Sequence, residues 1–148
     1  MEKGYTLIEL IIVVSVMMIL TGLAIFNLQS IGGGANIEQA KTIVVAALRE
    51  AATSSRAVLD DQSWGVHFET NKIIIFASSG SGFSETDSKN KVKLLGDNIT
   101  CDVVLSGGGN DILFIKRTAG TDQPGTITLS LGSDNKEIII NSQGSINY

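Results

Sequence analysis

The chain has 148 residues and a mass of 15.6 kDa, which leaves room for one small domain beside an additional segment. A single proline and a hydrophobic content of 43% exclude an intrinsically disordered chain. With 11 basic against 15 acidic residues, the formal net charge of −4 argues against a protein whose main task is to bind a polyanion. The lone Cys101 excludes an intrachain disulfide, and its apolar neighbours predict a buried, unreactive thiol.

A long apolar run begins close to the N-terminus. No charged residue occurs from Leu10 to Phe26, and the stretch from Tyr5 to Leu28 supplies the roughly 20 residues that a helix needs to cross a hydrocarbon core. We therefore expect a membrane helix. Because Lys3 precedes this run and the next basic residue is Lys41, the positive-inside rule puts the N-terminus in the cytoplasm and the body outside.

One acidic residue, Glu9, lies just inside the expected helix. An acidic side chain at a transmembrane helix centre costs about 2.5–3.5 kcal/mol, and less near the end of the span. The carboxylate therefore either meets a positive partner, such as an amine of a second chain, or reaches the head-group layer by snorkelling. The residues alone leave both alternatives open.

The sequence from Lys3 to Leu10, KGYTLIEL, resembles the class III signal of type IV pilins and type II secretion pseudopilins. In that family a prepilin peptidase cuts after the glycine and methylates the new amino group. The resemblance implies that Gly4 ends a leader of residues 1–4 and that Tyr5 is the methylated N-terminus, although the family most often has phenylalanine there. It also implies that Glu9 meets the N-terminal ammonium of a neighbouring subunit. A secretory signal peptide fits less well, because the apolar run is too long and the cleavage position precedes it.

A glycine-rich stretch, residues 32–35, separates the assembly helix of residues 5–31 from the remainder of the chain, residues 36–148. Each glycine costs about 1 kcal/mol relative to alanine inside a helix. We expect a hinge here, with an ordinary linker as the alternative.

Beyond the glycines the pattern predicts an amphipathic helix and then strands. Apolar residues recur every three or four positions from Ile37 to Val58, with an alanine-rich stripe that suits close packing on a sheet. From Ser63 the period becomes two, and Thr70-Asn71 joins this strand to Lys72–Phe76 as a hairpin. Further strands are expected at 92–95, 99–105, 112–116, 126–131 and 137–141, and the stretch 77–90 is expected to be a polar loop.

These elements predict the α+β class in a pilin-like arrangement: a long N-terminal membrane helix, then a second amphipathic helix packed on an antiparallel β-sheet body. The order of a helix followed by hairpins resembles the minor pseudopilin H and FimT-like branch of the family. The segments that carry this likeness are 48–58, 64–68, 126–129, 138–141 and Gly144.

Nothing in the body suggests an enzyme. The one histidine, His67, alternates with Trp64 and is expected on the solvent side of its strand, and no nucleophile, base and orienting group can be assembled around it. No Cys/His spacing or calcium loop indicates a metal, and the glycine clusters lack the remainder of a nucleotide fingerprint. We expect no catalytic residue, no metal and no cofactor.

The function implied by the resemblance is that of a structural, minor subunit of a type II secretion pseudopilus or a type IV pilus. Its partners would be the prepilin peptidase, other pilin or pseudopilin subunits, an inner-membrane assembly platform and the lipid bilayer. The alternative is a DNA-binding component of a DNA-uptake pilus, as in FimT-like relatives. The basic residues available for that role are Lys89, Lys91, Lys93, Lys116 and Arg117.

Overall fold

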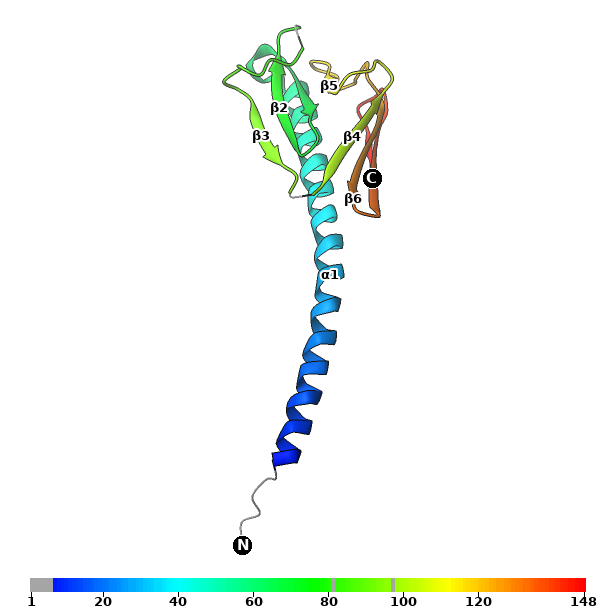
Figure 1. Ribbon diagram of the computed structural model, residues 1–148. Helices are drawn as coiled ribbons and strands as arrows, with labels where there is room; N and C mark the ends of the chain where they lie inside the picture. Colours follow the sequence, from blue (N-terminus) through cyan, green and yellow to red (C-terminus); the bar gives the residue numbers. More distant parts are fainter. Residues whose placement is uncertain (1–6, 81, 97) are drawn as a thin grey trace. The chain divides into compact units, whose positions relative to one another are not determined.

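The structure is a computed structural model that describes residues 7–80, 82–96 and 98–148, without the side chains of residues 19–35. It consists of two compact units, Met1–Ala35 and Asn36–Tyr148 (Figure 1). Helix α1 is assigned from Leu7 to Arg56 and contributes to both units. The leader of residues 1–4 lies outside the described residues. The residues of the expected hinge, 32–35, belong to the backbone assigned to α1, and their side chains are not described.

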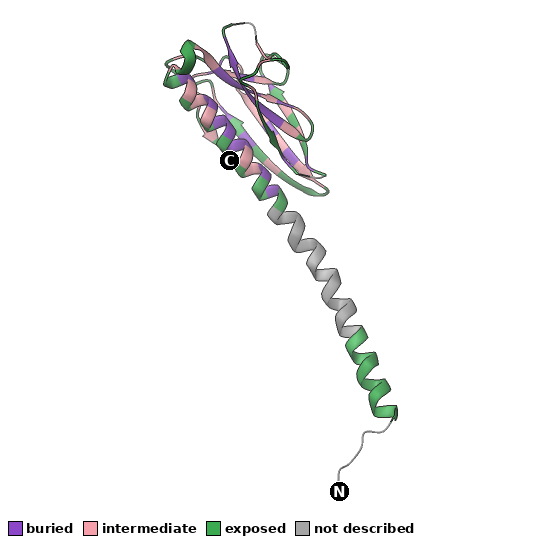
Figure 2. Cartoon of the chain, turned by 90° about the vertical axis from the view of Figure 1, so that its left-hand side faces the viewer, coloured by how far each residue is buried: buried purple, intermediate pink, exposed green. Residues whose placement is uncertain are grey.

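The described side chains of the first unit, residues 7–18, are exposed. The exposed fraction is 78% at Leu7 and 43% at Val14, and Figure 2 colours this whole segment as exposed. Nowhere in the described part of the chain does a helix combine the length and the apolarity that crossing a membrane requires. Of the span predicted from Tyr5 to Leu28, residues 5, 6 and 19–28 lie outside the described side chains.

The second unit contains two antiparallel sheets of four strands each, in the orders β3-β2-β1-β5 and β4-β6-β7-β8 (Figure 1). The α+β class is confirmed, although the strands divide between two sheets. A 3₁₀ turn, η1 (Leu59–Asp61), joins α1 to the first strand. The strands are β1 (Ser63–Phe68), β2 (Lys72–Ser78), β3 (Lys91–Leu94), β4 (Thr100–Leu105), β5 (Asp111–Phe114), β6 (Gly125–Leu131), β7 (Asp134–Ile140) and β8 (Ile146–Asn147).

The expected hairpin is β1 with β2, in which Trp64 lies opposite Ala77 and Phe68 opposite Ile73. The other strands lie within a few residues of their predicted positions, and only the short β8 was not foreseen. The predicted loop at 77–90 begins too early, because Ala77 and Ser78 belong to β2 and are buried. Both residues pair with residues of β1, Ala77 with Trp64 and Ser78 with Ser63. The polarity of the neighbouring sequence does not reveal this pairing.

One core joins the amphipathic part of α1 to both sheets. The predicted helix stripe is confirmed, since Ile37, Ala40, Val44 and Leu48 are at most 1% exposed. Figure 2 shows buried positions recurring along the part of the helix that lies beside the strands. Small alanines on this stripe allow the helix backbone to approach the strands closely. Burial of each large apolar side chain contributes about 1.5–3 kcal/mol. The sheet residues of this core include Val66, Phe68, Ile73, Ile75, Ile112, Phe114, Ile127, Leu129, Ile138 and Ile140.

Ser55, which is fully buried, connects the C-terminal end of α1 to the sheet through hydrogen bonds. Its hydroxyl accepts a hydrogen bond from the Trp64 amide at 2.7 Å, and its carbonyl accepts one from the Arg117 amide at 2.9 Å. The chain then leaves the helix through Val58, a β-branched residue with φ of 57°. Such a left-handed conformation is unfavourable for valine, so the surrounding hydrogen bonds must hold it in place.

Candidate functional site

The described part of the N-terminal helix presents an apolar surface with one carboxylate. Glu9 lies in the first turn of α1, where a negative charge interacts favourably with the helix dipole. The Ser15 hydroxyl donates to the Ile11 carbonyl at 2.8 Å, so its hydrogen-bonding need is met within the helix. The predicted cleavage and methylation residues, Gly4 and Tyr5, lie outside the described residues.

Most of the basic residues proposed for DNA contact are neutralised by carboxylates near the end of α1. Three ion pairs form: Lys89 with Asp60 at 3.0 Å, Lys91 with Glu50 at 2.6 Å, and Lys116 with Asp61. The hydrogen bond from Lys116 lowers the pKa of Asp61 below its ordinary value. Within the part of the chain that the structure describes, Lys93 and Arg117 have no ion-pair partner. Only two of these five basic residues therefore lack an ion pair, and one of the two, Arg117, acts electrostatically on Asp61, so the field offered to a polyanion is weak.

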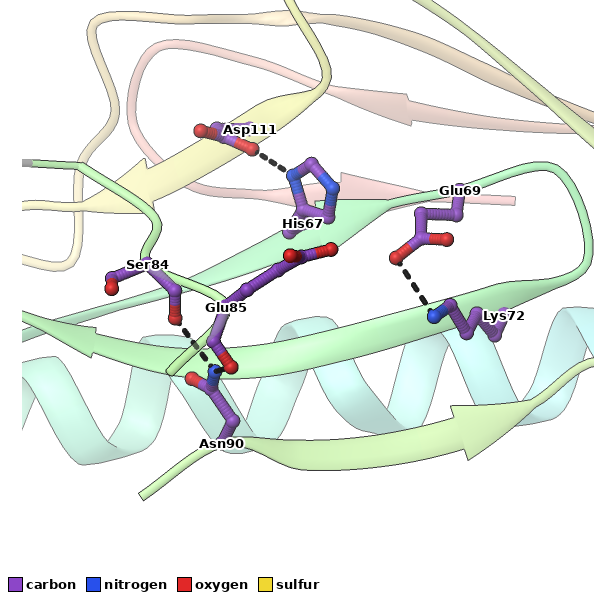
Figure 3. Close-up of polar contacts among 7 residues, drawn as sticks. All are labelled: His67, Glu69, Lys72, Ser84, Glu85, Asn90 and Asp111. Carbon is purple, nitrogen blue, oxygen red and sulfur yellow. Dashed lines mark hydrogen bonds and ion pairs between the residues drawn. The ribbon is translucent and has the colours of Figure 1, made fainter. Parts of the chain in front are cut away.

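His67 lies on the outer face of the first sheet, as the alternation predicts, but it is not solvent-facing. Its Nδ1 pairs with Oδ1 of Asp111 (Figure 3), and only 20% of its side chain is exposed. The ring of Phe83 stacks on the imidazole, with centroids 3.9 Å apart and planes 8° apart. Phe83 also packs edge-on against Phe76, with the two ring centroids 5.4 Å apart. The prediction was wrong on exposure because an aromatic side chain from the loop after β2 covers this face.

The backbone after Phe83 is held by a side-chain amide. Asn90 Nδ2 donates to the carbonyls of Ser84 at 2.8 Å and Glu85 at 3.3 Å (Figure 3). The only sequence sign of this arrangement is one phenylalanine within a polar stretch. Among the described residues, no hydroxyl or thiol is hydrogen-bonded to the His67 ring.

A polar cavity of about 430 Å³ lies beside the β1–β2 turn and β4. Cys101 lines it and is half-buried, not fully buried as predicted, and burial together with the charge of Asp102 raises the pKa of the thiol to about 12. Almost no thiolate is therefore present near neutral pH, which agrees with the expected lack of reactivity. No group of three or more metal-binding side chains occurs in the described ranges. The other lining residues include His67, Glu69, Thr70, Asn71 and Asn110.

Comparison with known proteins bears on the N-terminal helix. Residues 1–25 match the family model described as the prokaryotic N-terminal methylation motif. Comparisons with curated proteins and with solved structures find no match. The first 25 residues thus carry the class III signal of prepilin-type proteins, and the resemblance to the type IV pilin-like family is confirmed there. Proteins of that family are structural subunits that prepilin peptidase processes and that associate with other subunits.

Proposed function

We propose that the chain is a minor structural subunit of a type II secretion pseudopilus or a type IV pilus. The observation that carries this proposal is the match of residues 1–25 to the N-terminal methylation motif. The loose likeness of the body to the minor pseudopilin H and FimT-like branch favours a minor subunit.

Maturation follows from the motif. Prepilin peptidase cuts between Gly4 and Tyr5, removes the leader of residues 1–4 and methylates the amino group of Tyr5. Residues 5–31 then form the transmembrane and assembly helix, residues 32–35 the hinge, and residues 36–148 the extracytoplasmic domain.

The exposed apolar surface of residues 7–18 supports a place in the inner membrane. A contiguous apolar surface of this kind has to be covered by lipid or by other protein chains. We place the helix as a single pass, with its N-terminus in the cytoplasm, because Lys3 precedes it and Lys41 is the next basic residue. Assembly by an inner-membrane platform then moves the subunit from the bilayer into the filament, where neighbouring helices replace the lipid.

Glu9 is the residue that specifies this assembly. A carboxylate in apolar surroundings is costly, and the methylated ammonium of a neighbouring Tyr5 supplies the opposite charge. A buried pair of this kind adds little net stability, but it penalises every register in which one charge is left alone. The pair therefore selects one arrangement of neighbouring helices.

The DNA-uptake alternative receives less support. A binding face for phosphates needs several uncompensated lysines and arginines, whereas Lys89, Lys91 and Lys116 are each paired with a carboxylate. The net charge of −4 also disfavours binding to DNA. A salt-dependent affinity of the full chain for DNA would favour this alternative.

Cleavage provides the direct test. Intact-mass measurement of the protein from a cell with a prepilin peptidase should show loss of residues 1–4 and the gain of one methyl group. Gly4→Leu should keep the leader, because the bulkier side chain replaces the glycine that the motif supplies before the cut. Gly33→Leu introduces the same side chain far from the cut and should be processed normally. A Gly4→Leu protein that still begins at Tyr5 would contradict the assignment.

A further inference from the structure

The turn between β3 and β4 leads into a tripeptide that the processing motif does not explain. Asn98, Ile99 and Thr100 have the pattern Asn-x-Thr, which is the acceptor pattern for a sugar on the asparagine amide in exported proteins. Within the 148 residues of the sequence, no other asparagine is followed by a serine or threonine at the second position. So short a pattern also arises by chance, and its structural setting decides whether it can carry a sugar.

The fold turns both functional side chains of this tripeptide outward. Ile99 is 2% exposed and belongs to the core, whereas Asn98 and Thr100 on either side of it are exposed. Asn98 has a φ of 63°, a left-handed conformation that asparagine adopts more readily than most residues. The asparagine amide therefore points away from the core in a turn, as a modified asparagine must.

A neutral pocket of about 370 Å³ lies directly beside Asn98. Its polar lining consists of carboxamides, because Asn36 and Gln39 of α1 line it together with Asn98. Leu94, which is 69% exposed, supplies an apolar side. Among the described residues, no charged side chain lines this pocket. Carboxamides both donate and accept hydrogen bonds, as sugar hydroxyls do, and an apolar side chain packs on the C–H face of a sugar ring. The pocket therefore suits a neutral sugar.

We propose that Asn98 carries an N-linked saccharide whose first sugar lies in this pocket. The inference rests on the proposed function, because that function places the body outside the cytoplasm. The saccharide covers Leu94 and the open edge of β3, an edge strand whose four residues are all exposed. Such a cover prevents the edge from pairing with strands of other molecules.

The donor in this modification is a saccharide joined to a lipid through a phosphate group. The Asn98 Nδ2 atom attacks the anomeric carbon of the donor, where a C–N bond forms and the bond to the phosphate oxygen breaks. The lipid phosphate leaves with the electron pair, and a base of the transferase takes the amide proton. The transfer precedes folding, because burial of Ile99 keeps the folded tripeptide from bending into an enzyme site. The folded body then only has to accommodate the sugar, which the exposure of Asn98 allows.

Mass measurement of the full chain from the cell that naturally produces it tests the inference. The peptide that trypsin releases between Lys93 and Lys116 should carry the added mass of a saccharide. Asn98→Gln should lose this mass completely, and Thr100→Val should lose it although the asparagine remains, because the transferase recognises the hydroxyl. Thr100→Ser keeps a hydroxyl and should keep the saccharide. Asn135→Gln, at an exposed asparagine outside the pattern, is the control and should leave the mass unchanged.

The outcomes separate this inference from the proposed function, since the mass of the N-terminus reports processing and the tryptic peptide reports the sugar. An unmodified peptide in a chain that has lost residues 1–4 would overturn the inference and leave the function intact. A saccharide that persists in Asn98→Gln but is absent from Thr100→Val would belong to the Thr100 hydroxyl, and the assignment to Asn98 would be wrong. A chain that keeps its leader and still carries the saccharide would overturn the function alone. A chain with neither change would overturn both.

Discussion

The two units of this protein use the same residue types in opposite surroundings. Ile12 in the first unit is 58% exposed, whereas Ile75 in β2 of the second unit is fully buried. The body covers its own apolar side chains with strands and a helix face. The described helix of the first unit has no such cover within its own unit. The body is therefore expected to owe its stability to internal contacts, and the N-terminal helix to lipid or to other chains.

Matched alanine substitutions give the sharpest contrast. Ile75→Ala should lower the free energy of unfolding of the body by about 2–5 kcal/mol, because it leaves a cavity in a closely packed core. Ile12→Ala should leave that free energy unchanged. Denaturant unfolding of the full chain in detergent micelles, followed by the fluorescence of the single tryptophan, Trp64, measures both. Equal losses in the two variants would show that the first unit contributes to the core of the body.

Glu9→Ala tests whether the N-terminal helix depends on contacts with other chains. The substitution makes the helix more apolar, so membrane insertion and cleavage should be preserved. Incorporation into filaments should be lost, because the ammonium of the neighbouring copy would remain without a counter-charge, a defect of about 3–5 kcal/mol for a buried pair. Recovery in sheared filaments measures incorporation, and Glu85→Ala, at an exposed acid of the body, serves as the control. Normal incorporation of Glu9→Ala would leave snorkelling as the role of this carboxylate.

Ser55→Ala examines how the body holds the end of α1. Removal of the hydroxyl leaves the buried Trp64 amide without its acceptor, which should cost about 1–3 kcal/mol. Ser54→Ala changes the adjacent residue, whose hydroxyl makes no hydrogen bond among the described contacts, and should stay within about 0.5 kcal/mol. Thermal unfolding of both variants tests the difference. If the two lose equal stability, the Ser55 hydroxyl does not contribute to the junction.

Acid titration is expected to give the smallest effect. Hydrogen bonds from Lys136 and Lys41 lower the pKa of Glu38 from 4.5 to about 2. Because the folded pKa is lowered, the contribution of Glu38 is complete above about pH 4.5 and is lost as the pH falls through about 2. The difference in melting temperature between the wild type and Glu38→Gln should therefore shrink between pH 5 and pH 2, and it should be smaller in 1 M salt. A difference that is independent of pH would show that these contacts do not stabilise the folded body.

Local patterns predicted most of the elements of the body. Period-two alternation around Trp64 located β1 and β2, and recurrence at three and four residues located the buried face that includes Ala40 and Val44. The pattern also placed His67 on the face opposite Trp64. It did not reveal the stacking of Phe83 on that histidine, because this contact joins a strand to a loop 16 residues further along the chain. A lone aromatic residue in a polar stretch was the only available sign.

The sequence by itself determined the processing motif, the apolar N-terminal run, the α+β class and the buried face of the amphipathic helix. These properties depend on residue type and spacing along the chain, which a linear pattern records. Only the tertiary structure decided that the strands divide into two sheets, that Ser55 joins α1 to β1, and that Asn36, Gln39 and Asn98 line one pocket. Each of these depends on contacts between residues distant in the chain, whose geometry follows from packing the whole body at once.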